Sequence, residues 1–174
     1  MSPSGRSGSS ARTNLLVVAL ALMILFVLTS VTPGRAVAAT KQPFSAAIVI
    51  PPGGPSCDRL WIDEDDVIHA RGCVQSGTIT GDIEGEVLLR LNMNLASVGE
   101  NGPQEGVVNA KGTITMDGGE VAYTLSMSVV FAGGVGTGSF IMRGVNEFAG
   151  THVMGTITVN GDDPAEMIGI IFTA

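Results

Sequence analysis

The chain has 174 residues, a formal net charge of −7, 45% hydrophobic residues and only two cysteines. All 16 acidic residues follow residue 57, whereas Arg6, Arg12 and Arg35 lie near the N-terminus, so the later part of the chain is strongly acidic. Such a surface repels phosphate backbones, and this excludes nucleic acid as an expected partner.

Residues 1–39 have the three regions of a secretory signal peptide. Residues 1–14 are polar and basic, residues 15–28 are apolar, and residues 36–39 are small with A-x-A spacing. A transmembrane helix is the alternative, but the apolar run is shorter than the roughly 20 residues that span a bilayer. We expect cleavage near Ala38 or Ala39. Residues 40–174 would then be a single secreted or extracytoplasmic domain without a membrane span.

Cys57 and Cys73 both lie in the expected mature part. Export to an oxidising compartment and an even number of cysteines predict one disulfide between them. A free thiol pair or a metal site is the alternative, but with only His69 nearby the spacing lacks the pattern of a metal site. We therefore predict a disulfide and no metal centre.

The first predicted strand covers residues 44–50 and ends at the Pro- and Gly-rich residues 51–55. A hairpin follows, with strands at residues 60–62 and 67–74 around the acidic turn 63–66. The predicted disulfide would clamp this hairpin, and Trp61 is interpreted as its core anchor. Alternation places two sets on opposite faces of the return strand: Val67, His69, Arg71 and Cys73, against Ile68, Ala70 and Val74.

The middle of the chain alternates between apolar and polar residues with period two, which predicts antiparallel strands with one wet face. The last third continues with strands at residues 137–143, 151–159 and 167–173. The sequence Gly-Thr-Ile-Thr occurs at residues 77–80, 112–115 and 155–158, and each copy is predicted to point its isoleucine inward (Ile79, Ile114 and Ile157). Eight or nine strands with short turns favour an all-β, antiparallel up-and-down barrel of about eight strands, with a β-sandwich as the alternative.

Three stretches carry a family resemblance: residues 67–72 (VIHARG), residues 81–85 (GDIEG), and residues 136–140 (GTGSF) with 148–150 (FAG). Together they resemble the barrel superfamily of allene oxide cyclases and plant dirigent proteins. Members of that superfamily form eight-stranded barrels, often trimeric, whose cavities bind hydrophobic small molecules and guide or catalyse ring closure. The resemblance implies the same fold here, and it leaves open whether this chain forms a homo-oligomer. It transfers no catalytic residue.

Three other features are candidate sites. His69 and Arg71 share a strand face and could hold a carboxylate ligand, but a solvated face of an edge hairpin is the favoured interpretation. The four carboxylates of residues 63–66 lack the spacing of a calcium loop. The glycines of residues 133–138 lack the Lys-Ser/Thr ending of a phosphate loop. No cofactor is expected.

The leading hypothesis is a secreted barrel that binds a hydrophobic small molecule. Its predicted lining consists of inward-facing residues: Met93, Met116, Tyr123, Met127 and Phe140. Two hypotheses remain beside it, a dirigent-like or allene-oxide-cyclase-like cyclase or isomerase, and a structural or interaction protein of the cell envelope. The sequence leaves open whether the chain is an enzyme and which residues would be catalytic.

Overall fold

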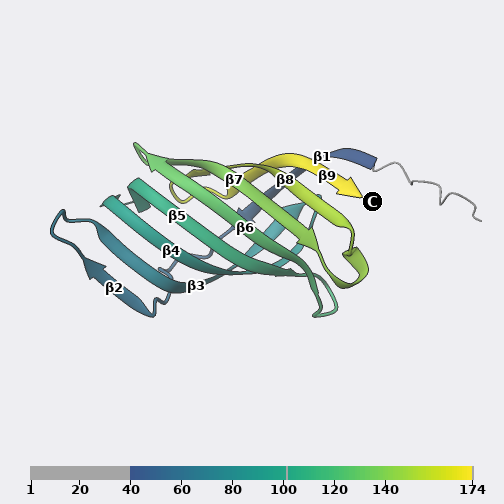
Figure 1. Ribbon diagram of the computed structural model, residues 1–174, viewed down its shortest axis with the longest axis horizontal. Helices are drawn as coiled ribbons and strands as arrows, with labels where there is room; N and C mark the ends of the chain where they lie inside the picture. The colour runs from purple at the N-terminus through teal and green to yellow at the C-terminus, as the bar shows by residue number, and fades with distance from the viewer. Residues whose placement is uncertain (1–39, 101, 174) are drawn as a thin grey trace, which may run out of the picture. The chain divides into compact units, whose positions relative to one another are not determined.

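The computed structural model describes residues 40–100 and 102–173, and the predicted signal peptide lies outside them. The described residues are all-β, as predicted, with nine antiparallel strands and one 3-10 turn, η1 (Asn146–Phe148) (Figure 1). The strands are β1 (Thr40–Val49), β2 (Arg59–Ile62), β3 (Ile68–Gly81), β4 (Gly85–Gly99), β5 (Gly102–Thr115), β6 (Val121–Ala132), β7 (Val135–Gly144), β8 (Thr151–Asn160) and β9 (Ala165–Thr173). None of the described segments is a helix long and apolar enough to cross a membrane.

The nine strands form one sheet that closes into a ring. Neighbours follow the order β1-β9-β8-β7-β6-β5-β4-β3-β2, and β1 also pairs with β3. Residues 46–49 of β1 lie opposite residues 78–81 of β3. Because this pairing joins β1, at one edge of the sheet, to β3, the eight strands β1 and β3–β9 complete the ring. β2 is attached outside it, paired with β3 alone.

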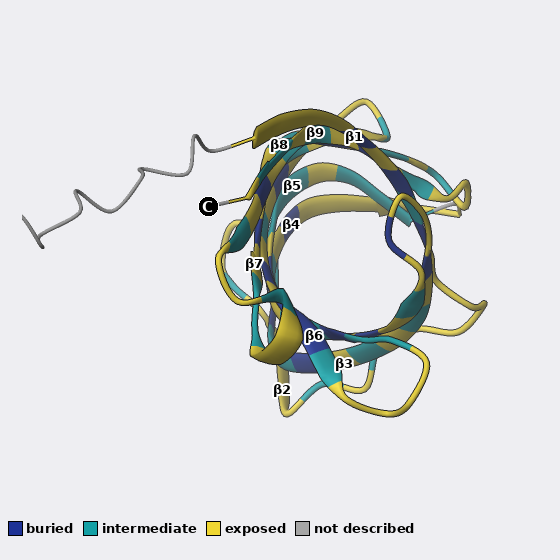
Figure 2. Cartoon of the chain, turned by 90° about the vertical axis from the view of Figure 1, so that its right-hand side faces the viewer, coloured by how far each residue is buried: buried dark blue, intermediate teal, exposed yellow. Residues whose placement is uncertain are grey.

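Alternation along the strands separates an apolar inner face from a mixed outer face. Figure 2 looks along the ring, with buried and exposed residues alternating along its strands. Ile79, Ile114 and Ile157 are all almost fully buried, which confirms the inward direction predicted for the three Gly-Thr-Ile-Thr copies. The inner side chains of β1 and β3–β9 form one hydrophobic cluster. Burial of this shared face is the main force that holds the ring closed.

Two phenylalanines cover a pair of glycines inside the ring. Across neighbouring strands, Phe140 of β7 lies opposite Gly155 of β8, Gly155 opposite Gly169 of β9, and Gly169 opposite Phe44 of β1. The centroids of the two phenylalanine rings lie 5.8 Å apart. The glycines leave room for these rings, and they allow the close strand approach that strong curvature requires.

The predicted faces of the third strand are wrong after Arg71. The β3–β4 register shifts between Ala70 and Cys73, where Gly72 takes a left-handed conformation with φ of 62°. This bulge inserts one extra residue and reverses the alternation. Cys73 therefore lies fully buried next to Ala70 on the inner side, and Val74 is 46% exposed on the outer side. The bulge turns Cys73 toward Cys57, and the predicted disulfide is present.

Candidate functional site

One end of the ring carries an apolar pocket of about 550 Å3, which we call the mouth pocket. Its walls come from the loop after β1, the start of β5, the turn between β6 and β7, and the turn between β8 and β9. Ile48 and Phe131, both members of the core cluster, reach into it from the ring interior. Its complete lining is Ile48, Ile50, Pro51, Pro52, Gly53, Pro55, Gln75, Gly102, Pro103, Phe131, Gly134, Val159, Gly161, Asp162, Asp163 and Ala165.

The local sequence explains why this end stays open to a ligand. Pro51, Pro52 and Pro55 cannot continue β1, so the chain leaves the sheet there and crosses the end of the ring as a loop. The turn from β8 to β9 supplies Asp162 and Asp163, which give the pocket a negative border. Among the described residues of the lining, Gln75 is the only other side chain with an amide or a charge. The pocket therefore combines an apolar interior with a single neutral hydrogen-bonding side chain.

The five residues predicted to line a ligand cavity all lie on the inner face, but none of them belongs to the mouth pocket. Phe140 and Tyr123 are buried in the core cluster, and Met116 and Met127 pack against it. Met93 is half-buried and lies between Ala70 and Val108 in the ladder. Their ligand role stays a prediction. The mouth residues Phe131, Val159 and Ala165 were missed because each lies at a strand end, where alternation is short.

Tyr123 is the only phenol in the core. Its ring packs against Phe148 of η1, with centroids 5.2 Å apart. Burial raises the pKa of Tyr123 above its usual 10.0, because the phenolate would lose its hydration. The hydroxyl is therefore neutral at physiological pH and cannot act as a general base there.

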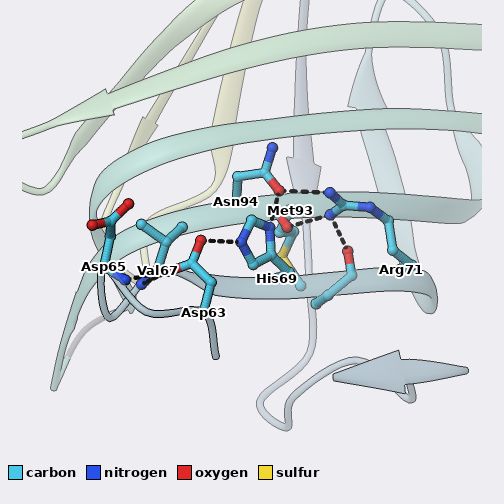
Figure 3. Close-up of polar contacts among 8 residues, drawn as sticks. Asp63, Asp65, Val67, His69, Arg71, Met93 and Asn94 are labelled. Carbon is cyan, nitrogen blue, oxygen red and sulfur yellow. Dashed lines mark hydrogen bonds and ion pairs between the residues drawn. The ribbon is translucent and has the colours of Figure 1, made fainter. Parts of the chain in front are cut away.

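A polar cluster lies on the outer side of β2–β4 and links the β2–β3 turn to β4 (Figure 3). His69 Nε2 lies 2.7 Å from Asp63 Oδ2, and His69 Nδ1 lies 2.8 Å from Asn94 Oδ1. Asn94 Oδ1 also accepts a hydrogen bond from the Arg71 guanidinium, at 2.7 Å. Because two oxygen atoms face the two ring nitrogens, His69 can donate from both of them only as an imidazolium.

Trp61 closes this cluster from outside, which corrects its predicted role as a core anchor. The indole is 43% exposed and stacks on the His69 ring, with centroids 4.9 Å apart. The Arg71 guanidinium lies 5.3 Å from the same indole. β2 is attached outside the ring, so Trp61 has no access to the ring interior. Its indole instead covers the His69 ring and the Arg71 cation, as electron-rich aromatic faces do.

The outward direction of His69 and Arg71 agrees with the favoured interpretation of a hairpin face. Arg71 Nη1 donates to the carbonyl oxygens of Ala70, at 2.9 Å, and Met93, at 2.6 Å. With these bonds and the one to Asn94, the guanidinium is engaged with the protein itself. The cluster therefore fastens the β2–β3 turn to β4, and its charged groups face away from the mouth pocket.

The acidic turn is organised by Asp63 and holds no metal-like cluster. Asp63 Oδ1 accepts hydrogen bonds from the backbone N–H groups of Asp65 and Val67, at 3.0 and 2.9 Å. Its other oxygen faces His69 of β3, so both carboxylate oxygens have hydrogen-bond partners within the protein. Among residues 40–100 and 102–173, no group of three His, Cys, Asp or Glu side chains is placed to hold a metal ion.

The Asp63–His69 pair predicts a pH window for stability. The hydrogen bond to Asp63, then that to Asn94, raises the pKa of His69 above 6.5, and the hydrogen bond to His69 lowers the pKa of Asp63 below 3.8. His69 therefore stabilises the fold below pH 6.5 and loses this effect as the pH rises through its raised pKa. Asp63 stabilises above pH 3.8 and loses the effect as the pH falls through its lowered pKa.

We expect Asp63→Asn to lower the melting temperature most between pH 3.8 and 6.5, with a smaller difference from the parent above and below this window. Thermal unfolding at a series of pH values measures this. Asp65→Asn is the matched control, because it removes a charge from the same turn and Asp65 gives only its backbone N–H to the cluster. If Asp63→Asn lowered the melting temperature by the same amount at every pH, the ion pair would be contradicted.

Neither a protein-family model, nor a curated protein, nor a solved structure matches this chain significantly.

Proposed function

We propose that the protein is a secreted eight-stranded barrel that binds a neutral hydrophobic small molecule at the mouth pocket. The observation that carries the proposal is the pocket of about 550 Å3 with Ile48 and Phe131 at its inner end. Its volume falls in the range typical of small-molecule sites, which are mainly apolar with few polar groups. The predicted inner residues, Phe140 and Met127 among them, would support the pocket from below.

The charge at the border favours a neutral or cationic ligand over an anionic one. Asp162 and Asp163 lie at the edge of the pocket and give it a negative border. An anionic head group would be repelled there, whereas a neutral molecule can use Gln75 for one hydrogen bond. The expected ligand is therefore apolar with one polar substituent.

Binding is favoured over catalysis by the composition of the inner face. The described core contains no buried charged side chain, and Tyr123 is held neutral. A cyclase or isomerase of the dirigent-like kind would need a group that stabilises or moves charge, unless shape alone guided the reaction. A carrier and a cyclase can be distinguished by the molecule that they release, because a carrier returns its ligand unchanged and a cyclase returns a ring-closed product. A structural protein would bind neither a ligand nor a substrate.

Secretion is part of the same proposal. The Cys57–Cys73 disulfide supports an oxidising compartment, since such bonds are rare in reducing cytosol. The signal peptide proposed for residues 1–39 would deliver the chain there.

We expect Ala165→Phe to weaken binding of the neutral fluorescent dye Nile red at least about tenfold, because the added ring fills the mouth pocket that Ala165 lines. Dye titration followed by fluorescence measures this. Ala132→Phe is the matched control, since Ala132 is exposed at the end of β6 and lies outside the pocket. Equal dye affinity in the two variants would contradict the proposed site.

A further inference from the structure

The outer wall of the ring carries a second concavity, of about 370 Å3, over β4–β7. We call it the outer hollow. Its outward-facing residues are polar on all four strands, with one apolar residue at a border: Arg90, Asn92, Asn109, Lys111, Ser126, Ser128, Ser139 and Ile141. The strands that form its floor also contribute Ala110, Met127 and Phe140 to its lining, and Phe140 and Met127 are two of the residues predicted above to line a ligand cavity. The outer hollow shares no lining residue with the mouth pocket.

The register shows how the hollow is made. Asn92 of β4 lies opposite Asn109 of β5, Asn109 opposite Ser128 of β6, and Ser128 opposite Ser139 of β7. Neighbouring strands lie about 4.8 Å apart, so these four side chains form a continuous polar row. The serines are short and the flanking residues are long, and this difference in length hollows the wall.

Two cations lie side by side at one border of this row. Arg90 and Lys111 are direct cross-strand partners in the β4–β5 ladder, and like charges in this position repel each other. Asp58 accepts a hydrogen bond from Arg90 at 2.9 Å and compensates one of them. Within the described residues, Lys111 forms no ion pair. The hollow therefore carries about one positive charge in excess.

This excess is unusual in a strongly acidic chain. Its carboxylates gather in the turns and near strand ends, whereas Arg90 and Lys111 are the sixth residue of β4 and the tenth of β5. Among the described residues, Asp58 is the one carboxylate that forms an ion pair with this cationic pair. The arrangement suits a ligand that brings about one negative charge.

One amide of the hollow is held in place by the backbone of β3. Asn92 Oδ1 accepts a hydrogen bond from the Gly72 N–H of the bulge, at 3.1 Å, which leaves the amide nitrogen of Asn92 as its free donor. Asn109 and the three serines can each donate and accept. Arg90 uses one nitrogen on Asp58 and retains further donors for a second carboxylate.

We infer that the outer hollow binds a sugar unit that carries one carboxylate. The carboxylate lies at Lys111 and Arg90, the hydroxyls meet the row from Asn92 to Ser139, and a C–H face of the ring packs on Ile141. A peptide added as a further strand does not fit, because β4–β7 are each paired on both sides. A purely apolar ligand would leave the amide and hydroxyl groups without partners.

Titration of the full secreted protein with sodium glucuronate, glucose or sodium acetate tests this inference, with amide chemical shifts read by NMR. We expect glucuronate to move the signals of Asn92, Asn109 and Ser128, and to bind at least tenfold more tightly than glucose or acetate. Equal binding of acetate would reduce the hollow to a simple anion site, and equal binding of glucose would remove the role of the cations. Either outcome, or no binding of glucuronate, overturns the proposal.

Lys111→Met should weaken glucuronate binding about tenfold. Lys41→Met is the matched control, because it removes the same charge from β1, outside the hollow. Both lysines are exposed, so both variants are expected to fold, and their melting temperatures check this. Equal loss of affinity in the two variants would show a nonspecific charge effect and would refute the site. Binding that weakens with added salt only for the parent and Lys41→Met would agree with it.

Discussion

Gly155→Val is expected to lower the free energy of unfolding by at least about 3 kcal/mol, or to prevent folding, because it overfills a packed strand pair. A Cβ atom at Gly155 would lie 2.6 Å from the Cα of Gly169 and would overlap the carbonyl oxygen of Ile168. These are backbone atoms of a paired strand, so they cannot move without loss of ladder hydrogen bonds. Thermal unfolding measures the effect, with an expected drop of roughly 10 °C.

Gly54→Val is the matched control for that substitution. Gly54 lies in the loop after β1, and a Cβ atom there meets nothing within 4 Å. Its melting temperature should stay close to that of the parent. If Gly155→Val melted at the same temperature as Gly54→Val, the close approach of β8 and β9 beneath Phe140 and Phe44 would be wrong.

Replacement of both cysteines by alanine should cost about 3 kcal/mol of unfolding free energy. Cys57 and Cys73 are 16 residues apart, and in the chain-entropy model a loop of that size loses about this much when it is opened. Urea unfolding of the parent and of Cys57→Ala/Cys73→Ala measures the difference. The effect should concentrate in the loop after β1 and in β2, since β2 has no sheet partner other than β3.

Reduction supplies the internal control for the disulfide. A thiol reductant should lower the stability of the parent toward that of the double variant and should leave the double variant unchanged. Hydrogen exchange in β2 should then accelerate more than in β6, which is paired on both sides. If the reductant lowered the stability of the double variant by the same amount, the loss of stability would not come from the disulfide.

Period-two alternation was sufficient to predict the all-β class and most inward residues, because a half-buried strand must alternate. Ile79, Ile114 and Ile157 lie inside the ring as expected. The bulge at Gly72 was not predictable in the same way, since one extra residue leaves no mark on composition but reverses every later face of that strand. The positions of Cys73 and Val74 were wrong for this reason.

The position of β2 depended on ring closure, which no local pattern records. β1 and β3 pair through only four residue pairs, and this contact leaves β2 outside. Trp61 therefore stacks on His69 at the surface although tryptophan is typical of cores. Once the sheet order is known, the stacking follows from the register, because Trp61 and His69 are direct partners.

The candidate sites were only partly predictable for a related reason. Inward direction could be assigned to Phe140 and Met127, but the mouth pocket is formed where turns from distant parts of the chain meet at one end of the ring. The outer hollow likewise depends on the registers of β4–β7, which place Arg90 beside Lys111. Both sites arise from contacts between segments that are distant in the sequence, whereas the sequence pattern specifies faces within a strand.

The protein thus has an apolar inside, acidic ends and a cationic hollow in its wall. The central claim is that a neutral hydrophobic molecule occupies the mouth pocket. Native mass spectrometry of the secreted protein, taken from the medium without denaturation and compared with Ala165→Phe, tests this claim directly. We expect an added mass of one small molecule on the parent and none on Ala165→Phe. A parent that carries no added mass, and acquires none from a mixture of neutral apolar compounds, would contradict it.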